Sequence, residues 1–186
     1  MQLPAHLSQL ILQTERLILR EVNPEIIEYL YTQCSDEDIM SYKGFPTREW
    51  LEAEKEKQKG GFTTHRIRLK GFLIVLNETN ETIGACHYHT WQPAHSRAEI
   101  GYGMYKDEYK NKGYMKEAVT AILHHGFEIM GLNRVEALVG PANEPSLRLV
   151  KSLGFTQEGI LREHYCKDGE LQDSIIFSLL KKEYKK

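Results

Sequence analysis

The segment from Arg97 to Gly131 constrains the fold more than any other stretch of the chain. Its first part, Arg97 to Tyr105, carries apolar residues at period two, which is typical of a β-strand with one buried face. Its last part, Gly113 to Met130, carries apolar residues at helical spacing. A turn with one glycine and two lysines, Lys110 to Met115, joins the two. The segment therefore predicts a strand, a turn and an amphipathic helix in immediate succession.

The turn has the features of an anion-binding site. The first turn of a helix leaves backbone N–H groups without partners inside the helix, and the helix dipole adds partial positive charge there. Gly113 would let a ligand approach the backbone closely, while Lys110 and Lys112 add two cations. A diphosphate would suit this arrangement well. An ordinary helix start with a turn glycine would have the same residues, so the turn alone leaves both interpretations open.

Length, composition and charge narrow the class of protein. The chain has 186 residues, enough for one domain with a sizeable core, and its apolar runs fall well short of the roughly 18 residues that span a bilayer. Residues 1–13 lack the basic start of a secretory signal. The formal net charge of −2 offers no field for nucleic-acid binding. Cys34, Cys86 and Cys166 are odd in number and far apart, which favours reduced thiols. We therefore expect a cytoplasmic protein with no membrane or nucleic-acid partner.

The remaining sequence predicts an α+β fold with a mixed, mostly antiparallel sheet in the order β-αα-βββ-α-β-α-ββ. Residues 1–13 are expected to form an N-terminal extension, either a short helix or a disordered arm, and Ser35 to Gly44 a loop or short turn. The other elements expected in the first half are a strand at Thr14 to Val22, helices from Pro24 and after Thr47, and a hairpin of Phe72 to Leu76 with Ile83 to Trp91. Those expected in the second half are a strand at Arg134 to Val139, a helix capped by Asn143 and closed by Gly154, and an antiparallel pair of Phe155 to Tyr165 with Ser174 to Lys181.

Five blocks of sequence carry a resemblance to a known family. They are TERLILRE at Thr14 to Glu21, AEIGY at Ala98 to Tyr102, EYKNKGYMKEA at Glu108 to Ala118, NEPSLRLVKSLGF at Asn143 to Phe155, and EGILRE at Glu158 to Glu163. In these blocks the chain resembles the GCN5-related N-acetyltransferases (GNAT), and within them the RimJ/RimL-like branch that acetylates ribosomal-protein N-termini. The resemblance implies a single GNAT domain over residues 14–186, which transfers an acetyl group from acetyl-CoA directly to an amine in a ternary complex.

The resemblance also implies where acetyl-CoA is bound. The pyrophosphate loop of the family reads (Gln or Arg)-x-x-Gly-x-(Gly or Ala), whereas this chain has Lys110 and Met115 at the first and last positions. These departures place the pyrophosphate contacts on backbone N–H groups, with Lys112 as an electrostatic supplement. The residues expected to contact acetyl-CoA are Gly103, Met104, Tyr105, Lys110, Asn111, Lys112, Gly113, Tyr114, Met115, Asn143 and Ser146.

Three residues are catalytic candidates. Glu99 stands where histone-acetylating members have a general base, although strand position alone would make it a surface carboxylate. A base is needed because an amine of pKa about 10.4 is almost wholly protonated at neutral pH. Many family members have a tyrosine acid where this chain has Val150, so Ser146 and Tyr165 are the candidate acids for the leaving thiolate, and neither need act.

The acetyl acceptor is the least constrained part of the sequence. The branch favours a protein N-terminal α-amine, and a small amine such as a polyamine or antibiotic is the alternative. A noncatalytic acyl-CoA-binding module, a structural interaction domain and a homodimer also stay open. His87, His89 and Trp91 share one strand face that can line the acceptor cleft. We expect no metal site there, because no spaced cysteine pair or HExxH motif accompanies the histidines.

Overall fold

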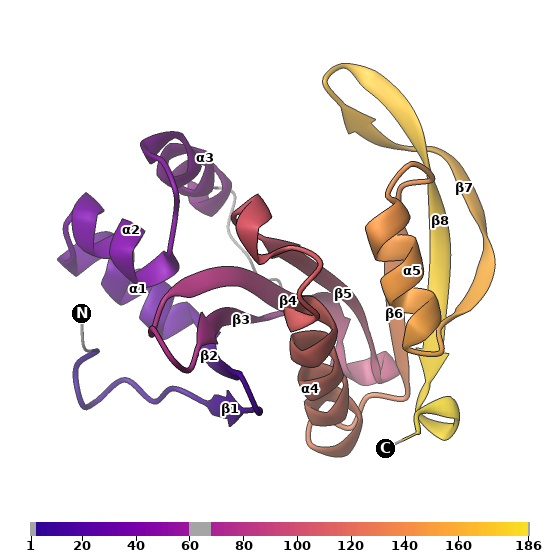
Figure 1. Cartoon of the computed structure of the whole chain (residues 1–186), viewed down its shortest axis with the longest axis horizontal. Coiled ribbons are helices and arrows are strands. Elements are labelled where there is room, and N and C mark those ends of the chain that lie inside the picture. Colours follow the sequence, from indigo (N-terminus) through magenta and orange to yellow (C-terminus); the bar gives the residue numbers. More distant parts are fainter. Residues whose placement is uncertain (1–2, 60–67, 186) are drawn as a thin grey trace.

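The computed structural model describes residues 3–59 and 68–185. Within these ranges the chain forms five α-helices and one mixed sheet of eight strands, in the spatial order β1-β2-β3-β4-β5-β6-β8-β7 (Figure 1). The predicted α+β class with a mixed sheet is confirmed. The elements are β1 (Ile11–Gln13), β2 (Leu17–Val22), α1 (Pro24–Gln33), α2 (Asp36–Lys43), α3 (Arg48–Lys59), β3 (Arg68–Leu76), β4 (Thr82–Gln92), β5 (Arg97–Met104), α4 (Tyr114–Glu128), β6 (Arg134–Val139), α5 (Glu144–Ser152), β7 (Thr156–Lys167) and β8 (Glu170–Leu180).

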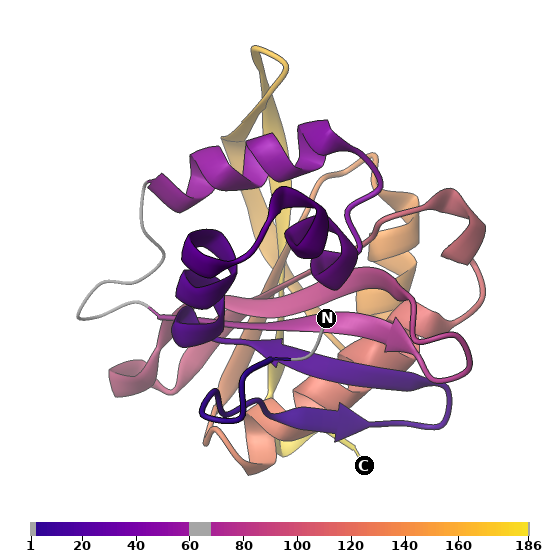
Figure 2. The same cartoon turned by 90° about the vertical axis from the view of Figure 1, so that its left-hand side faces the viewer.

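Helices cover both faces of the sheet because the buried strands are apolar on both faces. In β3, Phe72 and Ile74 belong to the core cluster that includes α4, whereas Leu73 and Val75 belong to the cluster that includes α1, α2 and α3. Alternate side chains of a strand point to opposite faces, so the two clusters lie on opposite sides of the sheet. Figure 2 shows α1–α3 on one side of the strands and α4 on the other.

The strands β5 and β6 diverge soon after they begin. They pair in parallel over only three positions, of which the last joins Glu99 to Glu136. Beyond Glu99, β5 continues for five residues with no β6 partner, while it stays paired to β4 as far as Met104. The sheet therefore opens between these two strands, directly after the candidate base.

Two local predictions near the N-terminus were wrong. Ile11–Gln13, expected within a short helix or disordered arm, forms β1 and pairs antiparallel with β2, because Leu10 and Leu12 pack against the main core. The segment expected as a loop or short turn after Ser35 contains the helix α2. Ser35 caps this helix by accepting a hydrogen bond from the Asp38 N–H at 3.1 Å, and Gly44 ends it in the left-handed conformation with φ 73°. A capping serine followed by three acidic residues was the overlooked signal.

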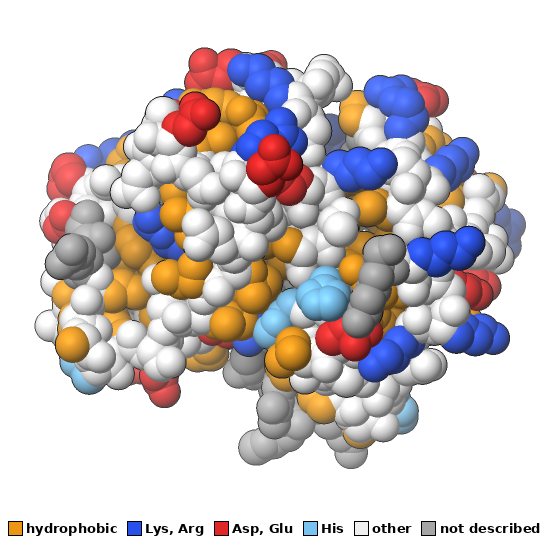
Figure 3. All heavy atoms as spheres, turned by 60° about the horizontal axis from the view of Figure 1, so that its bottom comes forward, with side chains coloured by type: hydrophobic (Ala, Val, Ile, Leu, Met, Phe, Trp, Pro, Cys, Tyr) orange, Lys and Arg blue, Asp and Glu red, His pale blue; other side chains and the backbone are white. Residues whose placement is uncertain are grey.

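The surface places charge of both signs around hydrophobic areas on the face drawn in Figure 3. The hairpin of β7 and β8 projects from the body in Figure 1, and it leaves Ile160, Tyr165 and Leu171 exposed. Among the helices in the described ranges, none is both long and apolar enough to cross a membrane.

Candidate active site

A cleft lies where the end of β5 meets the first turns of α4 and α5. Its volume is about 460 Å³. Nine of the eleven residues expected to contact acetyl-CoA line it, namely Gly103, Met104, Lys110, Asn111, Gly113, Tyr114, Met115, Asn143 and Ser146. We call this space the donor cleft. It joins residues from two separate sequence blocks, at the start of α4 and at the start of α5.

The turn into α4 leaves the backbone at the helix start open to a ligand. Gly113 is the N-cap of α4, with φ 83°, and no side chain in the described chain caps the helix there. Asn111 also has a left-handed backbone, with φ 58°. Glycine is required at 113 because the left-handed region disfavours other residues, and an added Cβ would lie 3.3 Å from an Arg16 nitrogen. The first N–H groups of α4 are thus available to an anion.

The segment just before β2 holds this turn in place. Arg16 Nη1 donates to the Lys112 carbonyl at 3.0 Å, and Arg16 Nε donates to Glu117 in the first turn of α4 at 2.7 Å. Glu117 also accepts from the Thr14 hydroxyl at 2.6 Å, and these bonds lower its pKa against the opposing effect of burial. The Arg16 guanidinium lies 4.7 Å from the centre of the Tyr114 ring. The block TERLILRE therefore clamps the turn, a role that the sequence alone did not reveal.

Two of the predicted donor-site residues are not among those that line the donor cleft. The Lys112 carbonyl accepts from Arg16, and the Lys112 ammonium lies 5.9 Å from the centre of the ring of Tyr109, which does line the cleft. Tyr105 lines a different cavity, against α3. Its side chain packs edge-on to Trp50 of that helix, with ring centres 5.3 Å apart. Alternation along the strand explains this, because Tyr105 follows Met104 and points to the opposite face.

Tyr102 is a donor-cleft residue that the sequence analysis missed. Its hydroxyl is buried and meets no hydrogen-bond criterion within the described ranges. Burial raises the pKa of Tyr102, and the nearby side chain of Ser146 offsets part of that rise. A buried hydroxyl without a partner is costly, and the side chain of Ser146 is the group placed to supply one. The signal was present in AEIGY, where Tyr102 shares a strand face with Ile100 and Met104.

Glu99 lies in a second cavity, distinct from the donor cleft, where β5 and β6 diverge. This space of about 1100 Å³ is also lined by His89, His164 and Tyr165, and Asn143 and Pro145 line both it and the donor cleft. Burial, and then the nearby Glu136, raise the pKa of Glu99 to about 7, while Arg97 opposes the rise. A carboxyl with a pKa near the working pH is suited to proton transfer.

His89 of β4 lies beside Glu99, just before the point where the register of β4 with β5 becomes irregular. His89 Nε2 lies 3.5 Å from Glu99 Oε1, and His89 Nδ1 lies 3.3 Å from the Thr90 hydroxyl. Burial lowers the pKa of His89, so the imidazole is neutral at neutral pH and does not hold Glu99 ionised. Thr90 has φ 50° where the register of β4 with β5 shifts, an unusual conformation for a β-branched residue.

The two candidate acids lie in different spaces. Ser146 lies in the donor cleft at the first turn of α5, where its N–H donates to the Asn143 side chain at 3.2 Å. Tyr165 lies in the cavity of Glu99 and has 59% of its surface exposed. Asn143 thus caps α5, as predicted, and also borders both spaces.

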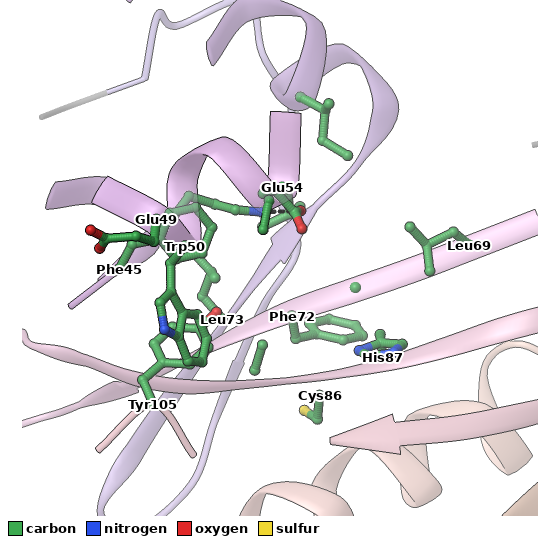
Figure 4. A pocket seen from close by; sticks show the side chains of 16 residues that line it. Phe45, Glu49, Trp50, Glu54, Leu69, Phe72, Leu73, Cys86, His87 and Tyr105 are labelled. Carbon is green, nitrogen blue, oxygen red and sulfur yellow. Dashed lines mark ion pairs between the residues drawn. The ribbon is translucent and has the colours of Figure 1, made fainter. Parts of the chain in front are cut away.

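A third cavity, of about 570 Å³, lies between α3 and the sheet (Figure 4). By alternation along β5, Glu99 and Tyr105 point to the same face of the sheet, so the cavity lies on the face of Glu99. Phe45, Trp50 and Tyr105 form one wall, with ring centres 5.3 to 6.3 Å apart. His87 and Phe72 lie across from them in Figure 4. We call this space the α3 cavity.

Comparisons with known proteins identify the family. The family model "Acetyltransferase (GNAT) domain" matches residues 16–156. The uncharacterized N-acetyltransferase p20 of Bacillus licheniformis is 37% identical over 174 residues, which cover 93% of this chain and 97% of that protein. The spermidine N(1)-acetyltransferase of Escherichia coli (strain K12) is 27% identical over 169 residues, covering 89% and 87%.

A solved structure agrees over nearly the same length. It is that of a Vibrio cholerae protein assigned as a ribosomal-protein-serine acetyltransferase, with a TM-score of 0.64, 25% identity, and 92% of this chain and 97% of that chain covered. The family match, the relative above 30% identity and the opened sheet agree. The chain belongs to the GNAT acetyltransferase family and is an N-acetyltransferase.

Proposed function

We propose that the chain transfers the acetyl group of acetyl-CoA directly to the α-amine of a protein N-terminus. GNAT acetyltransferases use acetyl-CoA as cosubstrate. The observation that supports proton transfer is the raised pKa of Glu99, about 7, beside the opening between β5 and β6. The choice of acceptor is supported by the similarity to the Vibrio cholerae protein assigned as a ribosomal-protein-serine acetyltransferase.

The donor cleft fits acetyl-CoA. The uncapped start of α4 supplies N–H groups for the diphosphate, and Gly113 permits the close approach that a ligand requires. The end of β5, which has no β6 partner, offers backbone donors further along the cleft. When bound, acetyl-CoA supplies the activated acetyl group, and the reaction forms an N–C bond while the C–S bond breaks. Lys110 lines the cleft and adds positive charge at its rim.

Glu99 is better matched to an α-amine than to a lysine side chain. A carboxylate of pKa about 7 that takes a proton from an α-ammonium of pKa about 7.7–8.0 works against roughly one pKa unit, or about 1.4 kcal/mol. The same transfer from a lysine-type ammonium of pKa about 10.4 works against roughly 4.6 kcal/mol. The difference of roughly 3 kcal/mol comes from the two amines and is the same for a base of any pKa, so an α-amine is the easier acceptor for Glu99 but is not selected by it.

Ser146 is the better placed of the two candidate acids for the thiolate. It lies in the donor cleft beside Tyr102, whereas Tyr165 stands on the exposed hairpin in the other cavity. A fall in kcat in Ser146→Ala, with Tyr165→Phe close to wild type, would support Ser146. Unchanged kcat in Ser146→Ala would remove it from the mechanism.

A small polyamine is the second candidate acceptor. The relative named as a spermidine N(1)-acetyltransferase, at 27% identity over 89% of this chain, favours it. A thiol-release assay with acetyl-CoA separates the candidates, using peptides with a free α-amine and no lysine, lysine peptides with a blocked N-terminus, spermidine and an aminoglycoside. We expect turnover with the α-amine peptides. Turnover confined to spermidine or to lysine peptides would contradict the proposed acceptor.

A further inference from the structure

The α3 cavity is an apolar space built from distant parts of the chain. Its walls come from β2, α1, α2, α3, β3, β4, the residue that follows β5, and Phe45 between α2 and α3. Trp50 keeps 43% of its surface exposed although it packs on Tyr105, so an apolar ring faces open space here. The described apolar residues that line the cavity are Val22, Ile27, Phe45, Trp50, Ala53, Leu69, Phe72, Leu73, Ala85, Cys86 and Tyr105, of which Phe72 and Cys86 belong to the core cluster on the α4 face. Filling such a space removes apolar surface from water.

The cavity reaches the catalytic face through His87. This residue lines the cavity, and a Cβ added to Gly101 would lie 2.5 Å from His87 Nε2, so the imidazole covers the strand at Gly101. Gly101 is two residues from Glu99 on the same face of β5, a separation of roughly 6.5 Å. The ring of His87 also lies 5.2 Å from that of His89, the neighbour of Glu99. An amine held at Glu99 is thus about two residues' length from the His87 edge of the cavity.

The two carboxylates of the cavity differ in their surroundings. Glu54 lies 3.7 Å from the buried ammonium of Lys43. Glu49, at the exposed start of α3, accepts from the Thr47 hydroxyl and its own backbone N–H, and these bonds lower its pKa, so it stays ionised. The described apolar residues that line the interior offer no partner to an ammonium. A buried ammonium without a partner is costly, so the interior of the cavity disfavours a polyamine chain.

We propose that the α3 cavity binds a large apolar side chain on the first or second residue of the acceptor polypeptide. The inference rests on the proposed N-terminal acceptor and adds a sequence preference to it. Aromatic or long aliphatic side chains fit the cavity by shape and polarity, whereas serine, alanine and glycine would leave it to water. Trp50, at the mouth of the cavity, is the main contact for such a side chain.

The test measures kcat and KM for three lysine-free peptides that differ only at their start, Ser-Gly, Phe-Gly and Ser-Phe, with spermidine as a fourth acceptor. Wild-type protein is compared with Trp50→Ala, which removes the apolar wall, and with Ala53→Leu, which blocks the cavity from an exposed site on α3. Ile129→Ala is the matched control, because Ile129 is 72% exposed and follows α4, outside the cavity. Melting temperatures confirm that each variant folds.

We expect kcat/KM at least tenfold higher for a phenylalanine peptide than for Ser-Gly. Both cavity variants should remove most of that advantage through KM and leave the Ser-Gly peptide within about twofold of wild type. Equal kcat/KM for all three peptides, or an equal loss for all three in Trp50→Ala, overturns the apolar site and leaves the N-terminal acceptor standing. Turnover of spermidine without turnover of any peptide overturns the proposed function itself.

Discussion

The donor cleft and the α3 cavity lie on opposite faces of one strand and are built in different ways. The donor cleft depends on consecutive residues of the turn Lys110 to Met115 and on the cap at Asn143, and it offers mainly backbone groups. The α3 cavity depends on side chains of separate segments packed against the sheet. Donor binding is thus encoded locally, whereas acceptor selection depends on how α1–α3 are placed. Variants on each side should therefore change one substrate's kinetics and spare the other's.

Glu99 stands between the two regions, so its loss should affect turnover without affecting either binding step. General bases typically contribute about 10²–10⁴-fold, and we expect Glu99→Gln to lower kcat about 10²-fold or more at pH 7.5. KM for acetyl-CoA should change little, because Glu99 does not line the donor cleft. Glu28→Gln, an exposed carboxylate on α1, is the control. A variant that fails to bind acetyl-CoA would show that the two regions are not separable.

The same substitution should stabilise the fold at alkaline pH. The folded-state pKa of Glu99 is raised from 4.5 to about 7, so the stability that its protonated form contributes is full below pH 4.5 and is lost as the pH rises through 7. Its ionisation can cost at most about 3 kcal/mol. Melting curves of Glu99→Gln and wild type should coincide near pH 4.5, and the variant should melt several degrees higher at pH 8.5. Equal melting temperatures at both pH values would contradict a raised pKa.

Changing the turn should harm only donor binding. Gly113→Ala forces a residue with a Cβ to adopt φ 83°, which costs about 1–2 kcal/mol, and we expect KM for acetyl-CoA to rise roughly tenfold. Gly159→Ala is the matched control, since its Cβ would meet nothing within 4 Å and its backbone is not left-handed. A rise in peptide KM instead would break the division between the two regions.

Loosening the clamp on the turn should have the smallest effect. Arg16→Gln loses the contacts to the Lys112 carbonyl and to Glu117, but the Arg16 side chain is 44% exposed, so solvent screens the pair. We expect KM for acetyl-CoA to rise about two- to fivefold, measured by initial rates at saturating peptide. Lys151→Gln, an exposed cation on α5, serves as control. No change in KM would show that the turn holds its shape without the clamp.

The sequence predicted the locally encoded parts well. The strand Arg134–Val139 was predicted with its correct bounds, and the strand, turn and helix around Gly113 follow from their periodicity. The helix α2 was missed because only its Ser35 cap and its Gly44 end mark it, not an apolar stripe. Tyr105 was assigned to the donor site as a backbone donor at the end of the strand, but its N–H donates to the Ile83 carbonyl at 2.9 Å, a pairing that depends on the neighbouring strand. The α3 cavity could not be predicted, since Trp50 and Tyr105 meet only through tertiary packing.

The pH dependence of kcat tests the central claim most directly. It should be measured at saturating acetyl-CoA and peptide from pH 6 to 9, for wild type and Glu99→Gln. If Glu99 is the base, wild-type kcat rises as the pH passes through about 7, where Glu99 loses its proton, and Glu99→Gln is slow and lacks that rise. Full turnover of Glu99→Gln across this range would contradict the assignment of Glu99 as the base.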